Sequence, residues 1–340
     1  YFFDDTKKID YAENAFDTAL KFYKDAGVKL VAATGDYSLY GEEESYREFN
    51  EAVKKSGLLV IACGGNHELY AKLDVMFGKN GYWRKYMNTG IYDGTVDGVL
   101  DIADNGIDFT YQLPEDESSV FISLSQWYWD GHTPAQEKLV EPEQLEWLEQ
   151  QLELHKDKTV YLLFHTYLSD DDRENIDGQG DLKSDGGYSY NGNYNQYTKD
   201  EKIFRDLLTK YDNVIWYNGH SHYEYSMQKY NENLNIYNYQ GTTATMIHVP
   251  SLTNPRTVAS GANHYSSLAG DASQGALQFV YDDYQIMNGL DLWGEEILSY
   301  ACYIIYTDKE FIDEYVITEQ KIPNTNITWT FNEQLNTLRF

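Results

Sequence analysis

The sequence predicts an α/β fold, on two observations. Over residues 1–222, apolar runs of strand length alternate with segments whose apolar residues recur at helical spacing. After residue 222, short strand-like runs replace the helical pattern. We see neither an internal repeat nor a linker. We therefore expect one domain over residues 1–310, with an extension at residues 311–340 packed on it.

The expected helices lie in the first two thirds of the chain. Asp10, with Glu13 three residues later, predicts a capping box for a helix that ends at Gly27. Helical periodicity predicts three more helices, at residues 43–55, 141–154 and 199–211. Between residues 70 and 118, Gly, Asn, Asp and aromatic residues predict loops, short helices and a hairpin.

The expected strands are apolar runs, and polar residues follow several of them. In the first part of the chain the runs are residues 28–34, 58–63, 120–124, 159–164 and 214–217. Later runs are residues 234–239, 243–249, 276–281 and 300–306. The residues that follow the earlier runs are Asp36, Asn66, His67, His165, His220 and His222. Because ligands bind at the carboxyl ends of strands in α/β sheets, we expect these side chains to lie together.

Five of these side chains are candidate metal ligands: Asp36, Asn66, His165, His220 and His222. Mixed oxygen and nitrogen donors suit zinc, iron or manganese. Two such ions, roughly 3.5–4 Å apart, can clamp the attacking and departing oxygens of a phosphoryl transfer and activate a shared water. His67 directly follows Asn66, so we expect its side chain to point elsewhere and to serve the leaving oxygen as proton donor or charge stabiliser.

Each segment alone is weak, because a Gly-Asp or Asn-His after a strand is most often a turn. As an ordered set, the segments resemble the calcineurin-like metallophosphoesterases, from about residue 12 to about residue 305. The segments that carry the resemblance are Gly35-Asp36, Gly65-Asn66-His67-Glu68, His165 and Gly219-His220-Ser221-His222. The family implies a four-layer α/β/β/α sandwich with two divalent or trivalent metal ions at the strand ends.

The resemblance also implies a role for each residue. Asp36 would bridge the two metals, and Asn66, His165 and His220 would complete one of them. His222 would serve the other metal, and His67 would assist the leaving group. The implied function is hydrolysis of small phosphomonoesters or phosphodiesters by a metal-bridging hydroxide.

One family motif is missing. The family's first strand carries Asp-x-His, which supplies two ligands to the metal shared with His222, and this sequence has no Asp-x-His before Gly35. Residues 1–5 resemble the segment directly after that motif, so we infer that the sequence begins just past it. The other interpretation is true loss, which would leave a catalytically impaired binding or scaffold protein on the same fold. A one-metal hydrolase acting on a non-phosphorus ester is a third alternative.

Composition limits the partners. Lys and Arg number 26 against 55 Asp and Glu, and the net charge of −29 disfavours nucleic-acid binding by electrostatics. No apolar run reaches the roughly 18 residues that span a bilayer. The two cysteines, Cys63 and Cys302, are expected to be buried thiols. Abundant Tyr and Asn with so little Cys suggest an exported bacterial protein, extracytoplasmic or secreted; the alternative is a cytoplasmic one.

Two further segments are expected near the pocket. Residues 169–198, rich in Asp, Gly, Asn, Ser and Tyr, predict a long surface loop that borders the site after His165. Residues 126–129, with three aromatic side chains, could line the substrate mouth or pack within the fold, and the sequence leaves both interpretations open.

Overall fold

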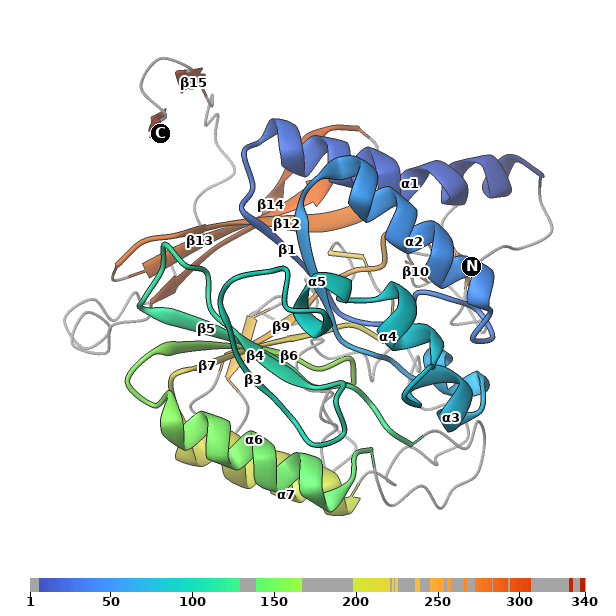
Figure 1. The fold of residues 1–340 in the computed structure, drawn as a ribbon. Coiled ribbons are helices and arrows are strands. Elements are labelled where there is room, and N and C mark those ends of the chain that lie inside the picture. The colour runs from blue at the N-terminus through green and yellow to red at the C-terminus, as the bar shows by residue number, and fades with distance from the viewer. Residues whose placement is uncertain are drawn as a thin grey trace.

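Two layers of β-strands stacked between two pairs of helices make up the fold in the computed structural model (Figure 1). The structure describes residues 6–128, 139–166 and 198–220. It also describes shorter stretches, namely residues 222, 224–225, 236–238, 245–253, 256–257, 266–267, 273–282, 284–292, 294–306, 330–332 and 337–339. The order of layers confirms the α/β class and the four-layer sandwich.

The larger sheet has seven strands in the order β3-β4-β5-β6-β7-β9-β8. Its parallel centre is β5 (Ser119–Ser123), β6 (Thr159–Leu163), β7 (Val214–Asn218) and β9 (Thr245–His248). At one edge β3 (Val99–Ile102) and β4 (Phe109–Tyr111) form the expected hairpin, and at the other edge β8 (Ile236–Asn238) runs antiparallel to β9. Parallel central strands are buried on both faces, which explains the continuous apolar runs in the sequence.

The central strands alternate between two cores. In β6, Val160 and Leu162 face one core while Tyr161 and Leu163 face the other. The first core lies under α6 (Pro142–Leu154) and α7 (Thr198–Lys210), which contribute Leu148, Leu152, Phe204 and Leu208. At its start, α6 has a capping box between Glu141 and Gln144 and a proline in its first turn.

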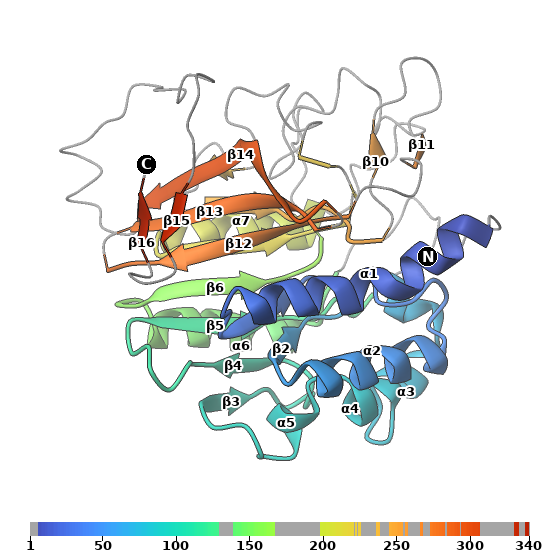
Figure 2. The same cartoon turned by 90° about the horizontal axis from the view of Figure 1, so that it is seen from above.

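The second layer contains two separate groups of strands. The parallel pair is β1 (Leu30–Ala33) with β2 (Leu59–Ala62). The antiparallel group is β12 (Gln274–Val280), β13 (Tyr284–Asp291) and β14 (Glu296–Tyr306). Ile61, Met287 and Ile305 from this layer pack on the larger sheet. Figure 2 shows α1 (Thr6–Asp25) and α2 (Glu43–Ser56) running beside these strands.

Short elements complete the described fold. Between β2 and β3 lie η1 (His67–Tyr70), α3 (Leu73–Met76), α4 (Tyr82–Tyr86) and α5 (Thr89–Tyr92), as the aromatic and glycine-rich sequence predicted. Two small hairpins are β10 (Arg256–Thr257) with β11 (Ser266–Ser267), and β15 (Thr330–Asn332) with β16 (Thr337–Arg339). Among the described residues, no helix has the length and apolar character needed to cross a bilayer.

Three expectations need correction. The first helix begins at Thr6, so Asp10 lies inside it rather than at its cap. Strand β13 is absent from the expected strands, because Asn288-Gly289 in its middle is typical of turns. Gly289 is instead required there, since a Cβ would lie 2.6 Å from that of Ala301. Both cysteines are free, but only Cys63 is fully buried, whereas Cys302 is half-buried.

Two expectations concern residues that are largely outside the described ones. The acidic loop at residues 169–198 falls almost wholly there. So does most of the extension at residues 311–340, and the division at residue 310 stays a prediction.

Candidate metal centre

The loops that follow β1, β2, β6 and β7 bring the predicted site residues together. Asp36 follows β1, Asn66 and His67 follow β2, His165 follows β6, and His220 follows β7. One donor atom from each of Asp36, His165 and His220 lies within 4.8 Å of the others. The structure thus places these three side chains around one point, where their donor set of one carboxylate and two imidazoles suits a transition metal.

Asn66 belongs to the same cluster. Its side-chain oxygen Oδ1 lies 2.8 Å from Nδ1 of His220 and 3.2 Å from Nε2 of His165. The two imidazole nitrogens are themselves 3.3 Å apart. Asn66 and His165 are each only 2 % exposed, so water does not separate these groups. The amide oxygen therefore faces the point on which the two imidazoles converge.

A backbone carbonyl fixes the tautomer of His165. Its Nδ1 lies 2.6 Å from the carbonyl oxygen of Thr34, so Nδ1 carries a hydrogen and donates it. The other nitrogen, Nε2, lies 3.1 Å from Oδ2 of Asp36. In a neutral ring Nε2 is an acceptor, and a carboxylate oxygen is also an acceptor, so a positive charge must lie between them. Either a proton or a metal cation meets that requirement, and a backbone contact that orients a ligating histidine is typical of metal sites.

Electrostatics within the cluster favour positive charge beside Asp36. Burial disfavours the charged ring of His165, but the Asp36 carboxylate outweighs it and raises the pKa of His165 above 6.5. Burial also opposes ionisation of Asp36, and the charge on His165 nevertheless holds the pKa of Asp36 well below its usual value. Burial, followed by the charge on His165, lowers the pKa of His220 well below 6.5. A bound metal cation would supply the positive charge that the Asp36 carboxylate favours at this point.

His222 and His67 approach Asp36 from outside this group. Nε2 of His222 lies 3.9 Å from Oδ2 of Asp36, and Nε2 of His67 lies 4.0 Å from the same oxygen. The backbone N–H of His67 donates to Oδ1 of Asp36 at 2.9 Å, and its ring Nδ1 lies 2.7 Å from the carbonyl oxygen of Leu39. The side chain of His67 is 17 % exposed, so solvent reaches it more readily than it reaches His165.

Strained backbone holds the site residues in place. Asp36, His220 and His222 have φ values of 60°, 69° and 65°. They are three of the five described non-glycine residues with positive φ. Such conformations persist only where surrounding contacts enforce them, and they gather at functional sites.

Two glycines leave room for the cluster. A Cβ on Gly35 would lie 2.5 Å from Nδ1 of His165, and a Cβ on Gly65 would lie 2.4 Å from Oδ1 of Asp36. These contacts explain why glycine precedes Asp36 and Asn66 in the sequence.

Glu68 is a residue of the site to which the sequence analysis assigned no role. Glu68 is fully buried, and its carboxylate accepts hydrogen bonds from the backbone N–H groups of Asp36, Tyr37 and Gly65 at 2.9, 2.9 and 2.7 Å. Burial, and then the nearby Asp36 carboxylate, raise the pKa of Glu68 to about 7. Glu68 lies in the first turn of a short helix after a glycine pair, and an acidic residue in such a place is usually a solvent-exposed capping residue. Its burial is therefore visible only in the packed structure.

The aromatic run at residues 126–129 packs within the fold where the structure describes it. The ring of Trp127 stacks on Phe77 with centroids 4.9 Å apart and an interplanar angle of 9°. Both side chains belong to the cluster under α3 and α4. Trp129 lies outside the described residues.

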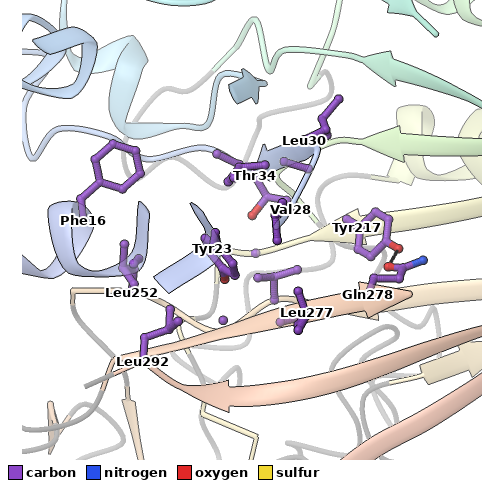
Figure 3. A pocket seen from close by; sticks show the side chains of 18 of the residues that line it. Phe16, Tyr23, Val28, Leu30, Thr34, Tyr217, Leu252, Leu277, Gln278 and Leu292 are labelled. Carbon is purple, nitrogen blue, oxygen red and sulfur yellow. Dashed lines mark hydrogen bonds between the residues drawn. The ribbon is translucent and has the colours of Figure 1, made fainter. Parts of the chain in front are cut away.

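A cavity of about 1030 Å³ runs from the site into the second layer. Asp36, His165, His220 and His222 are among the residues that line it. Figure 3 shows Val28 and Leu30 on one side of the cavity, Leu277 and Gln278 on the other, and Tyr23 of α1 between them. In the described structure, β1 is hydrogen-bonded only to β2, and β12 only to β13. The cavity therefore separates two strand edges, each paired on one side only.

Comparison with protein families matches residues 9–224 to the calcineurin-like phosphoesterases. The chain belongs to this family. In this calcineurin-like phosphoesterase the matched span contains every residue of the cluster described above. The resemblance drawn from the four sequence segments is therefore confirmed.

A solved structure shows the same fold. It is described as GAP50, the anchor in the inner membrane complex of Plasmodium, and it superposes with a TM-score of 0.52 at 12 % identity. The alignment covers 90 % of this chain and 86 % of that one. No curated protein matches this chain significantly by sequence.

Proposed function

We propose that this protein is a metal-dependent enzyme that hydrolyses small phosphomonoesters or phosphodiesters at a two-cation centre. The observation that carries the proposal is the convergence of Asp36, Asn66, His165 and His220 on one buried point, within a chain that belongs to the calcineurin-like phosphoesterases. Manganese, iron and zinc all suit these donors.

Charge explains why this chain would need cations for such a substrate. With a net charge of −29, the protein repels a phosphoester unless positive charge is held locally. Bound cations supply that charge to the phosphate oxygens and lower the pKa of a coordinated water towards neutrality. Asp36, Asn66, His165 and His220 would hold one cation, while Asp36 and His222 would contribute to the second.

His67 is placed to serve the leaving group. Its Nδ1 donates to the carbonyl of Leu39, so Nε2, 4.0 Å from the Asp36 carboxylate, is the nitrogen that faces a substrate oxygen, and the imidazolium form of the ring can pass it the Nε2 proton. The hydrogen bond between its backbone and Asp36 fixes the ring beside the cluster. We propose that His67 protonates the departing alcohol.

We also propose that the enzyme works outside the cytoplasm, a location that the abundance of tyrosine and asparagine with so little cysteine favours. Nucleic acid is not a proposed substrate, because the acidic surface repels it. The acidic composition instead fits a small substrate that is captured by the metal centre itself.

Turnover of model esters tests the proposed function. The full-length chain would be assayed with p-nitrophenyl phosphate, bis-p-nitrophenyl phosphate and a carboxyl ester, with and without Mn²⁺. We expect Mn²⁺-dependent release of p-nitrophenol from at least one phosphoester and none from the carboxyl ester. A chain that binds Mn²⁺ but hydrolyses no phosphoester would favour a binding or scaffold protein, and carboxyl ester turnover alone would favour a one-metal esterase.

A further inference from the structure

We propose that Glu68 is a positioning residue that holds the Asp36 carboxylate at the metal centre through the backbone of two loops. The consequence for turnover rests on the proposed function, whereas the structural part stands on the contacts of Glu68 alone. Glu68 belongs to the segment Gly65-Asn66-His67-Glu68, where it is the one non-glycine residue without an assigned role.

The two carboxylate oxygens of Glu68 accept four hydrogen bonds, two at each oxygen. Oε2 accepts the backbone N–H groups of Asp36 at 2.9 Å and Gly65 at 2.7 Å. Oε1 accepts the backbone N–H of Tyr37 at 2.9 Å and the hydroxyl of Tyr46 at 3.1 Å. These donors come from the loop after β1, the loop after β2 and helix α2. Glu68 thus ties together the two loops that supply Asp36 and Asn66.

Asp36 needs such a restraint, because its backbone φ of 60° is disfavoured for a residue with a Cβ. Its N–H donates to Glu68, while its side-chain Oδ1 accepts the N–H of His67 at 2.9 Å. His67 and Glu68 are neighbours in the chain, so these two hydrogen bonds close a ring between the loops. The ring fixes both the backbone and the carboxylate plane of Asp36, and its other oxygen Oδ2 then faces His165 at 3.1 Å.

Only a carboxylate satisfies this arrangement. An ionised carboxylate has two acceptor oxygens and no donor, which matches four converging donors. Glutamine has the same shape but would direct an amide N–H at two of these donors. The site is fully buried, so water cannot replace the lost hydrogen bonds.

The test compares Glu68→Gln with a matched control, Asp101→Asn. Asp101 accepts hydrogen bonds from Trp147 and Gln151 at 2.8 Å each and holds β3 to α6, far from the metal centre in the chain's topology. Mn²⁺ affinity would be measured by calorimetry on the full-length chain, at a temperature where circular dichroism shows each variant folded. We expect about 10- to 100-fold weaker binding in Glu68→Gln and unchanged binding in Asp101→Asn.

A metal-free readout separates this inference from the proposed function. Hydrogen exchange at the amides of Asp36, Tyr37 and Gly65 should be faster in Glu68→Gln than in the wild type, and unchanged in Asp101→Asn. If the wild type binds no Mn²⁺, the proposed function falls, and this exchange result decides the role of Glu68 by itself. Wild-type Mn²⁺ affinity in Glu68→Gln, or unchanged exchange at Asp36, would overturn the inference.

A second variant, Glu68→Asp, tests the proposal if Glu68→Gln does not fold. Glu68→Asp keeps the charge and the two acceptor oxygens, but its side chain is one methylene shorter, so the oxygens lie farther from the four donors. We expect it to fold and to bind Mn²⁺ with an affinity between those of the wild type and a complete loss. Full wild-type affinity in Glu68→Asp together with unchanged exchange at Asp36 would contradict the positioning role.

Discussion

Nε2 of His165 lies 3.1 Å from Oδ2 of Asp36, although Nδ1 of the same ring already donates its hydrogen to Thr34. Two acceptors at this distance require a positive charge between them. Burial disfavours the charged ring of His165, but the Asp36 carboxylate raises its pKa, so the surroundings favour positive charge at this point. A bound metal cation would supply that charge.

Removing one ligand should abolish cation binding at this point. We predict that His220→Ala lowers Mn²⁺-dependent turnover by about 100-fold or more, because second-sphere changes alone commonly cost 10–100-fold. The fold should remain, since the ring of His220 contacts mainly the polar cluster. Phosphoester turnover and circular dichroism measure the two effects.

His155→Ala provides the matched control for His220→Ala. His155 is 7 % exposed and caps the end of α6, away from the cluster, so its loss should reduce stability but leave Mn²⁺-dependent turnover unchanged. Equal loss of turnover in the two variants would mean that His220 acts through general stability rather than as a ligand.

A single methyl group on Gly65 should disrupt the centre. We predict that Gly65→Ala weakens Mn²⁺ binding by at least tenfold, because the new Cβ would lie 2.4 Å from Oδ1 of Asp36. Gly94→Ala is the control: it sits at φ 73° with nothing within 4 Å of a Cβ, so it adds strain without a collision at the site. Calorimetric titration of both variants measures the difference, and equal affinities would show that Asp36 tolerates displacement.

The leaving-group role of His67 predicts a dependence on substrate chemistry. His67→Ala should slow hydrolysis of an alkyl phosphoester by about 10²–10⁴-fold, the usual range for general acid catalysis. A p-nitrophenyl ester, whose leaving group needs little protonation, should be slowed far less. Relative kcat values for the two substrates provide the measurement. Equal slowing of both would remove His67 from the leaving-group step and leave it a role in charge stabilisation.

The sequence could predict which side chains lie together, because their order in the chain and their places after strands carry that information. Asp36, Asn66, His165 and His220 each follow an apolar run by no more than four residues, and parallel strands bring such exits to one edge. Their convergence could therefore be anticipated. The tautomer of His165 could not, because it depends on a carbonyl oxygen 131 residues away in the chain.

Where sequence reasoning failed, tertiary contacts had overridden local preference. The strand β13 contains Asn288-Gly289, a sequence typical of turns, yet Gly289 allows Tyr225, and Ala301 of the neighbouring strand β14, to pack closely against β13. The burial of Glu68 was equally hidden, because its four donors belong to segments up to 32 residues away. Local composition reports neither kind of contact.

A buried carboxyl outside the metal cluster, Asp108, predicts a pH dependence of stability. Burial raises the pKa of Asp108 to about 6 in spite of hydrogen bonds from Ser125, Gln144 and Asn105. The folded value exceeds the unfolded one. The stabilisation from Asp108 is therefore fully present below the unfolded pKa of 3.8 and is lost as pH rises through about 6.

The free energy of unfolding of the wild type, relative to Asp108→Asn, should thus fall by about 1.5 kcal/mol between about pH 5 and about pH 8. Urea denaturation of the metal-free proteins measures this difference. A difference that is constant with pH, or that rises with it, would show that Asp108 is ionised throughout in the folded protein.

The proposed metal centre can be tested by an anomalous difference map from crystals of the full-length chain grown with Mn²⁺. We expect a peak within bonding distance of Oδ2 of Asp36, Oδ1 of Asn66, Nε2 of His165 and Nδ1 of His220. A map with no peak among these four atoms at a saturating Mn²⁺ concentration, or with a peak only elsewhere in the molecule, would rule the centre out.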